Sequence, residues 1–218
     1  MGSKWKYPTM EFWRLELNTM TNTQDNRIVM KTKGKITGRV TVKRYLAGTV
    51  ERIEWLIYSL GKQKAKPYIK ELLQRNFIGV GAQNNNIVVS SANRGRNLIA
   101  QHLGDYGDDG VRTSYPLAIT YGEFGTGSTA PANSDIGLDT AVERSATASS
   151  EVVGNVVTIS FFFADANLPD DTYYEFGTFT SGTITLGSGQ LFNHALFSPN
   201  YVKATGEDTT VEVEFTIN

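Results

Sequence analysis

The second half of the chain is dominated by short apolar segments whose large side chains alternate with polar ones, and turn-forming residues separate these segments. In the last segment, TTVEVEFTIN, Val211, Val213 and Phe215 fall on one side of an extended chain, and Glu212 and Glu214 fall on the other. This alternation is typical of a half-buried strand. A succession of such segments predicts a mainly β protein, folded as an antiparallel β-sandwich or a jelly-roll-like domain.

Other segments carry the same signal. In KITGRVTVKRYL, Ile36, Val40 and Val42 share one parity, while lysines and arginines occupy several of the other positions. The segment at 53–60, IEWLIYSL, is a denser apolar run that fits either a strand or a buried helical turn. Strands are expected at 35–46, 84–91, 115–124, 155–165, 172–186, 190–197 and 209–218.

Helices are expected at three places. The segment at 62–75 gathers Tyr68, Ile69, Leu72 and Leu73 on one face, with a proline near its start. A second helix is expected over 91–107, ended by a glycine. A third, short helix is expected over 139–146, with an aspartate at its N-terminus. Residues 1–27 mix aromatic and polar side chains and are expected to form an N-terminal arm, followed by one β-sandwich domain at 28–218 with a basic helical insertion around 61–75.

Charge is distributed unevenly along the chain. Residues 1–104 hold 18 Lys and Arg and 6 Asp and Glu, a net charge of +12, whereas residues 105–218 hold 3 and 16, a net charge of −13. The two segments could simply mix on one surface. Alternatively, the basic half meets an acidic surface, which would be nucleic acid or the acidic part of a neighbouring copy.

Several function classes lack their usual residues. The chain has no cysteine and two histidines, His102 and His194, so neither a thiolate site nor a multi-histidine metal centre is expected. It contains no apolar run long enough to span a membrane and no secretory signal. Motifs of serine hydrolases, zinc proteases and thiol oxidoreductases are also missing. We therefore expect no catalytic residues, no cofactor and no contact with membranes.

The glycine-rich stretch at 121–137, YGEFGTGSTAPANSDIG, could be a ligand-binding loop or a connector. It has no basic residue and no phosphate-binding glycine motif, so a connector is the expected role. Gly125 and Gly127 can take positive φ angles at no steric cost, and the side chain of Ser134 or Asp135 can accept hydrogen bonds from nearby backbone N–H groups. Asp135, Asp139 and Glu143 recur every four residues, which suggests a helix start and ion pairing more than acid–base catalysis. Likewise, DYGDDG at 105–110 suggests a polar turn more than a calcium site.

The aromatic segment at 172–179 carries rings on both faces of the expected strand, which indicates that something covers each face: a second sheet on one side, and a helix, an arm or another subunit on the other. This argument, the charge distribution and the aromatic residues of the expected polar arm give a set of candidate interface residues: Trp5, Phe12, Trp13, Lys62, Lys64, Lys66, Tyr174 and Phe176.

Residues 92–218 resemble a class of structural proteins of tailed bacteriophages and prophages. The resemblance lies in the order of motifs: GRNLIAQHL, then LAITYGEFGTGSTAPANSDIGLDTAVERSAT, YYEFGTF and the final LFNHALFSPNYVKATGEDTTVEVEFTIN. It implies a β-sandwich subunit of the tail, neck, fibre or head decoration that assembles with copies of itself and with other virion proteins, after synthesis in the host bacterial cytoplasm. Two alternatives stay open: a carbohydrate- or surface-binding β-sandwich module, and a nucleic-acid-binding virion protein that uses residues 31–104.

Overall fold

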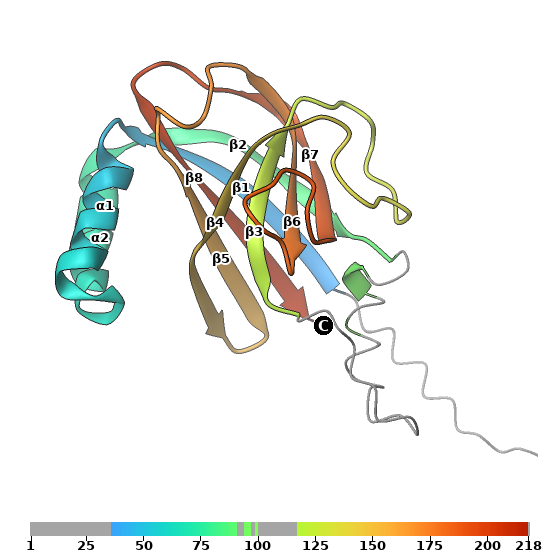
Figure 1. Ribbon diagram of the computed structural model, residues 1–218, viewed down its shortest axis with the longest axis horizontal. Coiled ribbons are helices and arrows are strands. Elements are labelled where there is room, and N and C mark those ends of the chain that lie inside the picture. The colour runs from blue at the N-terminus through green and yellow to red at the C-terminus, as the bar shows by residue number, and fades with distance from the viewer. Residues whose placement is uncertain (1–35, 91–93, 97–98, 100–116, 218) are drawn as a thin grey trace, which may run out of the picture. The chain divides into compact units, whose positions relative to one another are not determined.

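The computed structural model describes residues 36–90, 94–96, 99 and 117–217. The chain divides into two compact units, Met1–Lys33 and Gly34–Asn218, and every described residue belongs to the second unit. The expected arm at 1–27, most of the expected helix at 91–107 and the turn at 105–110 lie outside the described residues. The described elements are β1 (Ile36–Leu46), α1 (Thr49–Leu60), α2 (Lys62–Asn76), β2 (Phe77–Val88), β3 (Ile119–Gly125), β4 (Ala141–Val153), β5 (Val156–Phe163), β6 (Thr172–Thr180), β7 (Gln190–Val202) and β8 (Glu207–Ile217) (Figure 1).

The strands form a closed antiparallel barrel in the order β1-β2-β7-β6-β3-β4-β5-β8. The expectation of a mainly β fold is confirmed, but a sandwich or jelly roll is not what the strands build. The reason is that two strands, β2 and β4, each take part in both of the sheets that the strands form. β4 pairs with β3 through Ala141–Ala146 and with β5 through Thr147–Val153, and β2 pairs with β1 and, through Ile87 and Val88, with β7. The two sheets are therefore joined at both sides, which closes the barrel.

The expected alternation in the last strand is confirmed. Val211, Val213 and Phe215 of β8 are buried in the core. Their neighbours in β1 are equally buried, because Val40 lies opposite Val213 and Val42 lies opposite Val211. On the outer face of the same pair of strands, carboxylates of β8 meet cations of β1 in the ion pairs Arg39–Glu214 and Lys43–Glu212. A change of register by one residue would exchange these two faces, so the pattern specifies the register strongly.

Aromatic rings fill the barrel around Phe124 of β3, which is fully buried. The centroid of its ring lies 4.9 Å from the ring centroids of Phe163 and Tyr173 and 5.1 Å from that of Phe176. The edge-to-face and tilted arrangements of these rings are those that aromatic pairs prefer. This cluster joins β3, β5 and β6 into one core.

Strand β6 is covered on both faces, as expected, although strict alternation fails within it. The register between β6 and β7 shifts after Tyr173, so that Tyr173 and Phe176 both enter the core. Phe179 belongs to a second small cluster with Val89, Leu191 and Leu138, and Leu138 comes from the segment that joins β3 to β4. The cover on this other face of β6 is therefore a connecting segment of the same chain.

The expected short helix at 139–146 is wrong, because strand β4 begins at Ala141. Glu123 of β3 lies directly opposite Arg144 of β4, and the two side chains form a buried ion pair. This long-range pairing outweighs the weak local helix signal. The helix expected at 62–75 is confirmed as α2, and the ambiguous run at 53–60 forms most of helix α1.

The two helices form a hairpin inserted between β1 and β2. Gly61 joins them with a φ angle of 75°, a conformation that favours glycine. Its N–H donates to Ile57 O and its carbonyl accepts from Ala65 N, so one residue closes α1 and opens α2. Figure 1 shows the hairpin on one flank of the barrel, joined to it by β1 and β2. The few buried residues of the hairpin are Thr49, Val50, Ile53 and Ala65.

Candidate assembly surface

The connector between β3 and β4 is fastened to the barrel by Glu175 of β6, which is fully buried. Its Oε1 accepts hydrogen bonds from the backbone N–H of Gly127 at 3.0 Å and of Thr140 at 2.9 Å. Its Oε2 accepts from the N–H of Asp139 at 3.1 Å. One carboxylate thus satisfies backbone donors at both ends of the connector. The glycine-rich stretch is held by the fold itself, as a connector would be.

His194 of β7 links the same carboxylate to the middle of the connector. Its Nε2 lies 2.9 Å from Glu175 Oε2, and its Nδ1 lies 2.8 Å from Asp135 Oδ2. Burial acts to lower the pKa of His194, but its hydrogen bonds and charge interactions with the two carboxylates outweigh this effect and raise the pKa. Burial likewise acts to raise the pKa of Glu175, and hydrogen bonds from His194, Thr140 and Asp139 lower it overall. We therefore assign an imidazolium held between two carboxylates.

The glycines of the connector serve a different purpose from the one expected. Gly125 and Gly127 do not have positive φ angles. Instead, a Cβ atom at either position would collide with the Glu175 side chain. They are small because the backbone passes directly over that carboxylate. The expected hydrogen bond from Asp135 to nearby backbone is confirmed, since its Oδ2 accepts from Ala132 N at 2.8 Å.

A second buried ionic group fastens the loop between β6 and β7. The Nε of Arg144 lies 2.6 Å from Glu123 Oε2, and both side chains are almost completely buried. The guanidinium donates to the carbonyl oxygens of Thr183 and Thr185 at 2.8 Å and of Ser188 at 2.9 Å. Burial lowers the pKa of Arg144, and the interaction with Glu123 partly offsets this. The buried pair of Arg144 and Glu123 therefore holds the loop between β6 and β7 in place.

The acidic residues expected at four-residue intervals have separate structural roles. Asp135 binds His194, Asp139 accepts a hydrogen bond from Thr129 N, and Glu143 lies in β4, where burial raises its pKa. Among the described residues, no group of three or more His, Asp or Glu side chains is arranged to hold a metal ion. Within the described barrel, the buried polar side chains thus hold the connector between β3 and β4 and the loop between β6 and β7 in place.

The candidate interface residues fall into three groups. Lys62, Lys64 and Lys66 are exposed on α2. Tyr174 is half-buried on β6, and Phe176 is fully buried in the core, so Phe176 has no surface to offer a neighbouring subunit. Trp5, Phe12 and Trp13 lie outside the described residues.

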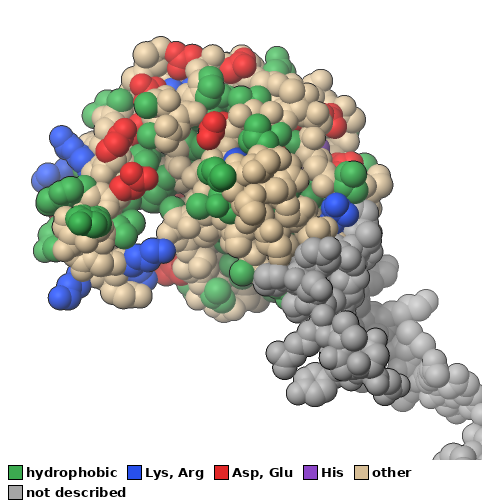
Figure 2. All heavy atoms as spheres, in the orientation of Figure 1, with side chains coloured by type: hydrophobic (Ala, Val, Ile, Leu, Met, Phe, Trp, Pro, Cys, Tyr) green, Lys and Arg blue, Asp and Glu red, His purple; other side chains and the backbone are tan. Residues whose placement is uncertain are grey.

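The helical hairpin carries exposed aromatic side chains that the sequence did not reveal as surface residues. Trp55 is 65% exposed, Tyr58 is 91% exposed and Tyr68 is 56% exposed. Figure 2 shows hydrophobic and basic side chains mixed over the hairpin on the left of the view. In the sequence these rings resembled core residues, because the apolar run at 53–60 fits a buried segment equally well. Exposed tryptophan and tyrosine are enriched at protein interfaces.

Charge on the hairpin is opposite to that of the barrel strands that follow it. Residues 49–76 contain six Lys and Arg and three Glu, a net charge of +3. Residues 117–217 contain two Lys and Arg and 13 Asp and Glu, a net charge of −11. The hairpin with its exposed rings is therefore a basic, partly apolar surface on an otherwise acidic domain, and we call it the candidate assembly surface.

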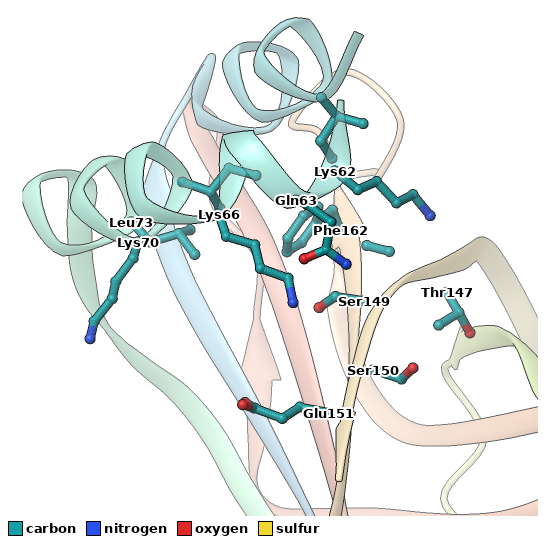
Figure 3. Close-up of a pocket in the computed structure, with 13 residues that line it drawn as sticks. Lys62, Gln63, Lys66, Lys70, Leu73, Thr147, Ser149, Ser150, Glu151 and Phe162 are labelled. Atoms are coloured by element: carbon teal, nitrogen blue, oxygen red, sulfur yellow. The ribbon is translucent and has the colours of Figure 1, made fainter. Parts of the chain in front are cut away.

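A groove of about 550 Å³ separates α2 from the strands β4 and β5. Lys62, Lys66 and Lys70 of α2 line this groove together with Ser149 and Glu151 of β4, and Figure 3 shows Lys66 extending toward Ser149. Apolar side chains form much of the lining, and they are Ile57, Ile69, Leu73, Ala148 and Phe162. The groove thus combines apolar walls with basic side chains.

Comparison with known protein families, curated proteins and solved structures finds no match to this chain. Within the described part, neither helix is long and apolar enough to cross a membrane. The argument for function therefore depends on the residues and their geometry.

Proposed function

We propose that this protein is a non-enzymatic structural subunit of a bacteriophage virion, located in the tail, neck, fibre or capsid decoration, and that it assembles through protein–protein contacts. The virion assignment is supported by the resemblance of residues 92–218 to phage structural proteins. The assembly role is supported by one structural observation, which is the hairpin that exposes Trp55, Tyr58 and Tyr68 while burying few of its own residues.

The partner of the candidate assembly surface is a second copy of the chain. Each copy carries a basic hairpin and an acidic barrel, so the hairpin of one copy is complementary in charge to the barrel of the next. Such a contact joins two different surfaces, and repeating it produces a ring or a stack. The aromatic rings supply the apolar area, and the charges orient the encounter.

Nucleic-acid binding is a second candidate, favoured by a specific observation on α2. Lys62, Lys64, Lys66, Lys70 and Arg75 are all exposed on this one helix. A phosphate backbone would be attracted by such a cluster, and its binding would weaken steeply as salt is added. Assembly is preferred because the exposed aromatic rings on the same hairpin also require a partner.

The virion assignment is tested by mass spectrometry of purified phage particles from the strain that encodes the protein. The wild-type chain should be present in particles, and a variant with Trp55→Ser and Tyr58→Ser should be depleted from them. A matched control is Ile184→Ser, since Ile184 is 71% exposed and belongs to the loop between β6 and β7, not to the hairpin. Absence of the wild-type protein from particles would contradict the virion assignment. Incorporation of the Trp55 and Tyr58 variant at the same level as the Ile184→Ser control would contradict the role of the hairpin.

A further inference from the structure

The groove beside α2 is bordered by strand β4. Five consecutive residues of β4, from Thr147 to Glu151, line it. The register of β4 with β5 shifts between Thr147 and Ser149, which interrupts strict alternation and lets consecutive residues of β4 line the groove. Pairing between β4 and β3 ends at Ala146, and from Thr147 onward β4 pairs with β5 alone among the described strands. The described structure therefore leaves one edge of β4 unpaired over 148–153.

This edge lacks two of the features that protect free edges in β proteins, and Glu151 is its one charged residue. The sequence from Ala148 to Val153 is ASSEVV, which contains no lysine and no proline. Val152 and Val153 are each 67% exposed. An extended edge with exposed β-branched side chains is a template for pairing with another strand.

The helix across the groove supplies the chemistry that would select the strand. Lys62, Lys66 and Lys70 recur every four residues along the side of α2 that lines the groove. Glu151 is the single acidic residue of the lining, so the basic side chains are in excess. A segment that carries carboxylates is therefore favoured. Apolar side chains between the lysines and on β5 would accept the alternating apolar residues of such a segment.

We propose that the groove binds an extended, acidic polypeptide segment of a partner protein, which adds as a strand to the free edge of β4 and places its carboxylates against Lys62, Lys66 and Lys70. Main-chain hydrogen bonds to β4 would provide affinity, and the lysines would provide selectivity. This site uses the side of the hairpin that faces the strands and shares Lys62 and Lys66 with the basic charge of the candidate assembly surface, whose exposed rings lie outside the groove lining. The inference does not depend on the chain being a virion subunit.

The experiment uses the full-length protein and three fluorescent peptides of about ten residues, the length of a long strand. The first alternates glutamate with valine, the second has lysine in place of glutamate, and the third is the acidic peptide with N-methyl groups on alternate residues. Anisotropy at low salt should show binding of the acidic peptide and loss of binding for the other two. On binding, hydrogen exchange at residues 148–153 should slow, because their amides gain partners.

Charge reversal at Lys66 and Lys70 to glutamate should weaken binding of the acidic peptide by about tenfold, as expected for losing two partly exposed ion pairs. The matched control is Lys64→Glu, because Lys64 is exposed on α2 but does not line the groove. It should change the affinity by less than about twofold, since its charge is farther from the bound segment. Circular dichroism would verify that both variants are folded.

Four results would overturn the proposal. They are equal binding of acidic and basic peptides, undiminished binding of the N-methylated peptide, amides at 148–153 that are already protected in the free protein, and an equal loss of affinity in the control variant. Binding of a single-stranded DNA oligonucleotide through the same lysines, with no binding of the acidic peptide, would also overturn it and would assign the groove to nucleic acid.

Discussion

Replacement of Glu175 tests the idea that one buried carboxylate holds the connector in place. In Glu175→Gln, the amide oxygen can keep the bonds from Gly127 and Thr140, and the amide NH₂ can donate to a neutral His194. The N–H of Asp139 then loses its acceptor. A buried donor without a partner costs about 1 to 3 kcal/mol, so the free energy of unfolding should fall by that amount.

In Glu175→Met, all three backbone N–H groups lose their acceptor, and the expected cost rises to about 3 to 9 kcal/mol. This is comparable with the whole stability of a typical domain, about 5 to 15 kcal/mol, so the variant should be partly unfolded at physiological temperature. Urea denaturation at about pH 6, where His194 is charged, measures both free energies. Equal losses below about 1 kcal/mol in both variants would refute the reasoning, because they would show that water replaces the carboxylate at no cost.

Further variants test other parts of the barrel. Phe215→Ala removes a buried ring of β8 and should lower the free energy of unfolding by about 3 to 5 kcal/mol; an unchanged melting temperature would show that the last strand is not part of the core. His194→Gln tests the pH dependence. Because the pKa of His194 is raised, its contribution to stability is complete below the ordinary value of 6.5 and is lost as the pH rises through the pKa of the folded state. Because the pKa of Glu175 is lowered, its contribution to stability is complete above the ordinary value of 4.5 and is lost on acidification. The stability advantage of wild type over His194→Gln should therefore be largest between these two values and should decrease in alkaline solution; a pH-independent difference in urea denaturation would contradict the charged state assigned to His194. Arg144→Lys keeps the charge but loses hydrogen bonds to the loop at 181–189, and each bond lost should lower the free energy of unfolding by about 1.5 to 3 kcal/mol. Limited proteolysis should then cut that loop faster than in wild type.

The elements that the sequence predicted well are those whose local pattern agrees with their environment in the fold. In β8, polar and apolar residues alternate without interruption, and the strand has one face in the core and the other in ion pairs. In α2, the apolar residues recur at helical spacing. Local pattern and tertiary packing favour the same structure in both cases, so a pattern argument was sufficient.

The failures occur where long-range pairing decides the outcome. Residues 141–146 form a strand that pairs with β3, where Arg144 lies opposite Glu123, and nothing near Arg144 in the sequence indicates that partner. Barrel closure depends on β2 and β4 changing partners along their lengths, which periodicity cannot show. Alternation in β6 fails for a similar reason, because its register with β7 shifts after Tyr173.

The candidate site was predicted in part. The positive charge of α2 was evident from its lysines, and these proved to be exposed. The aromatic rings of α1 were not expected at the surface, because Trp55 and Tyr58 lie in an apolar run that fits a buried segment. Their exposure follows from the insertion of the hairpin outside the barrel, where α1 buries Thr49, Val50 and Ile53. A fold that leaves a helix with so little packing is not evident from composition.

The most direct test of the central claim is light scattering of the purified full-length protein across a salt series. At about 0.05 M salt, where charges interact over more than about 10 Å, the wild-type protein should form rings or stacks larger than a dimer. These should dissociate towards about 1 M salt, where the screening length falls to about 3 Å. A variant with Lys62, Lys64 and Lys66 changed to glutamate should stay monomeric throughout. A wild-type protein that is monomeric at every salt concentration, or an assembly that ignores both salt and charge reversal, would contradict the claim that the basic hairpin binds the acidic barrel of a second copy.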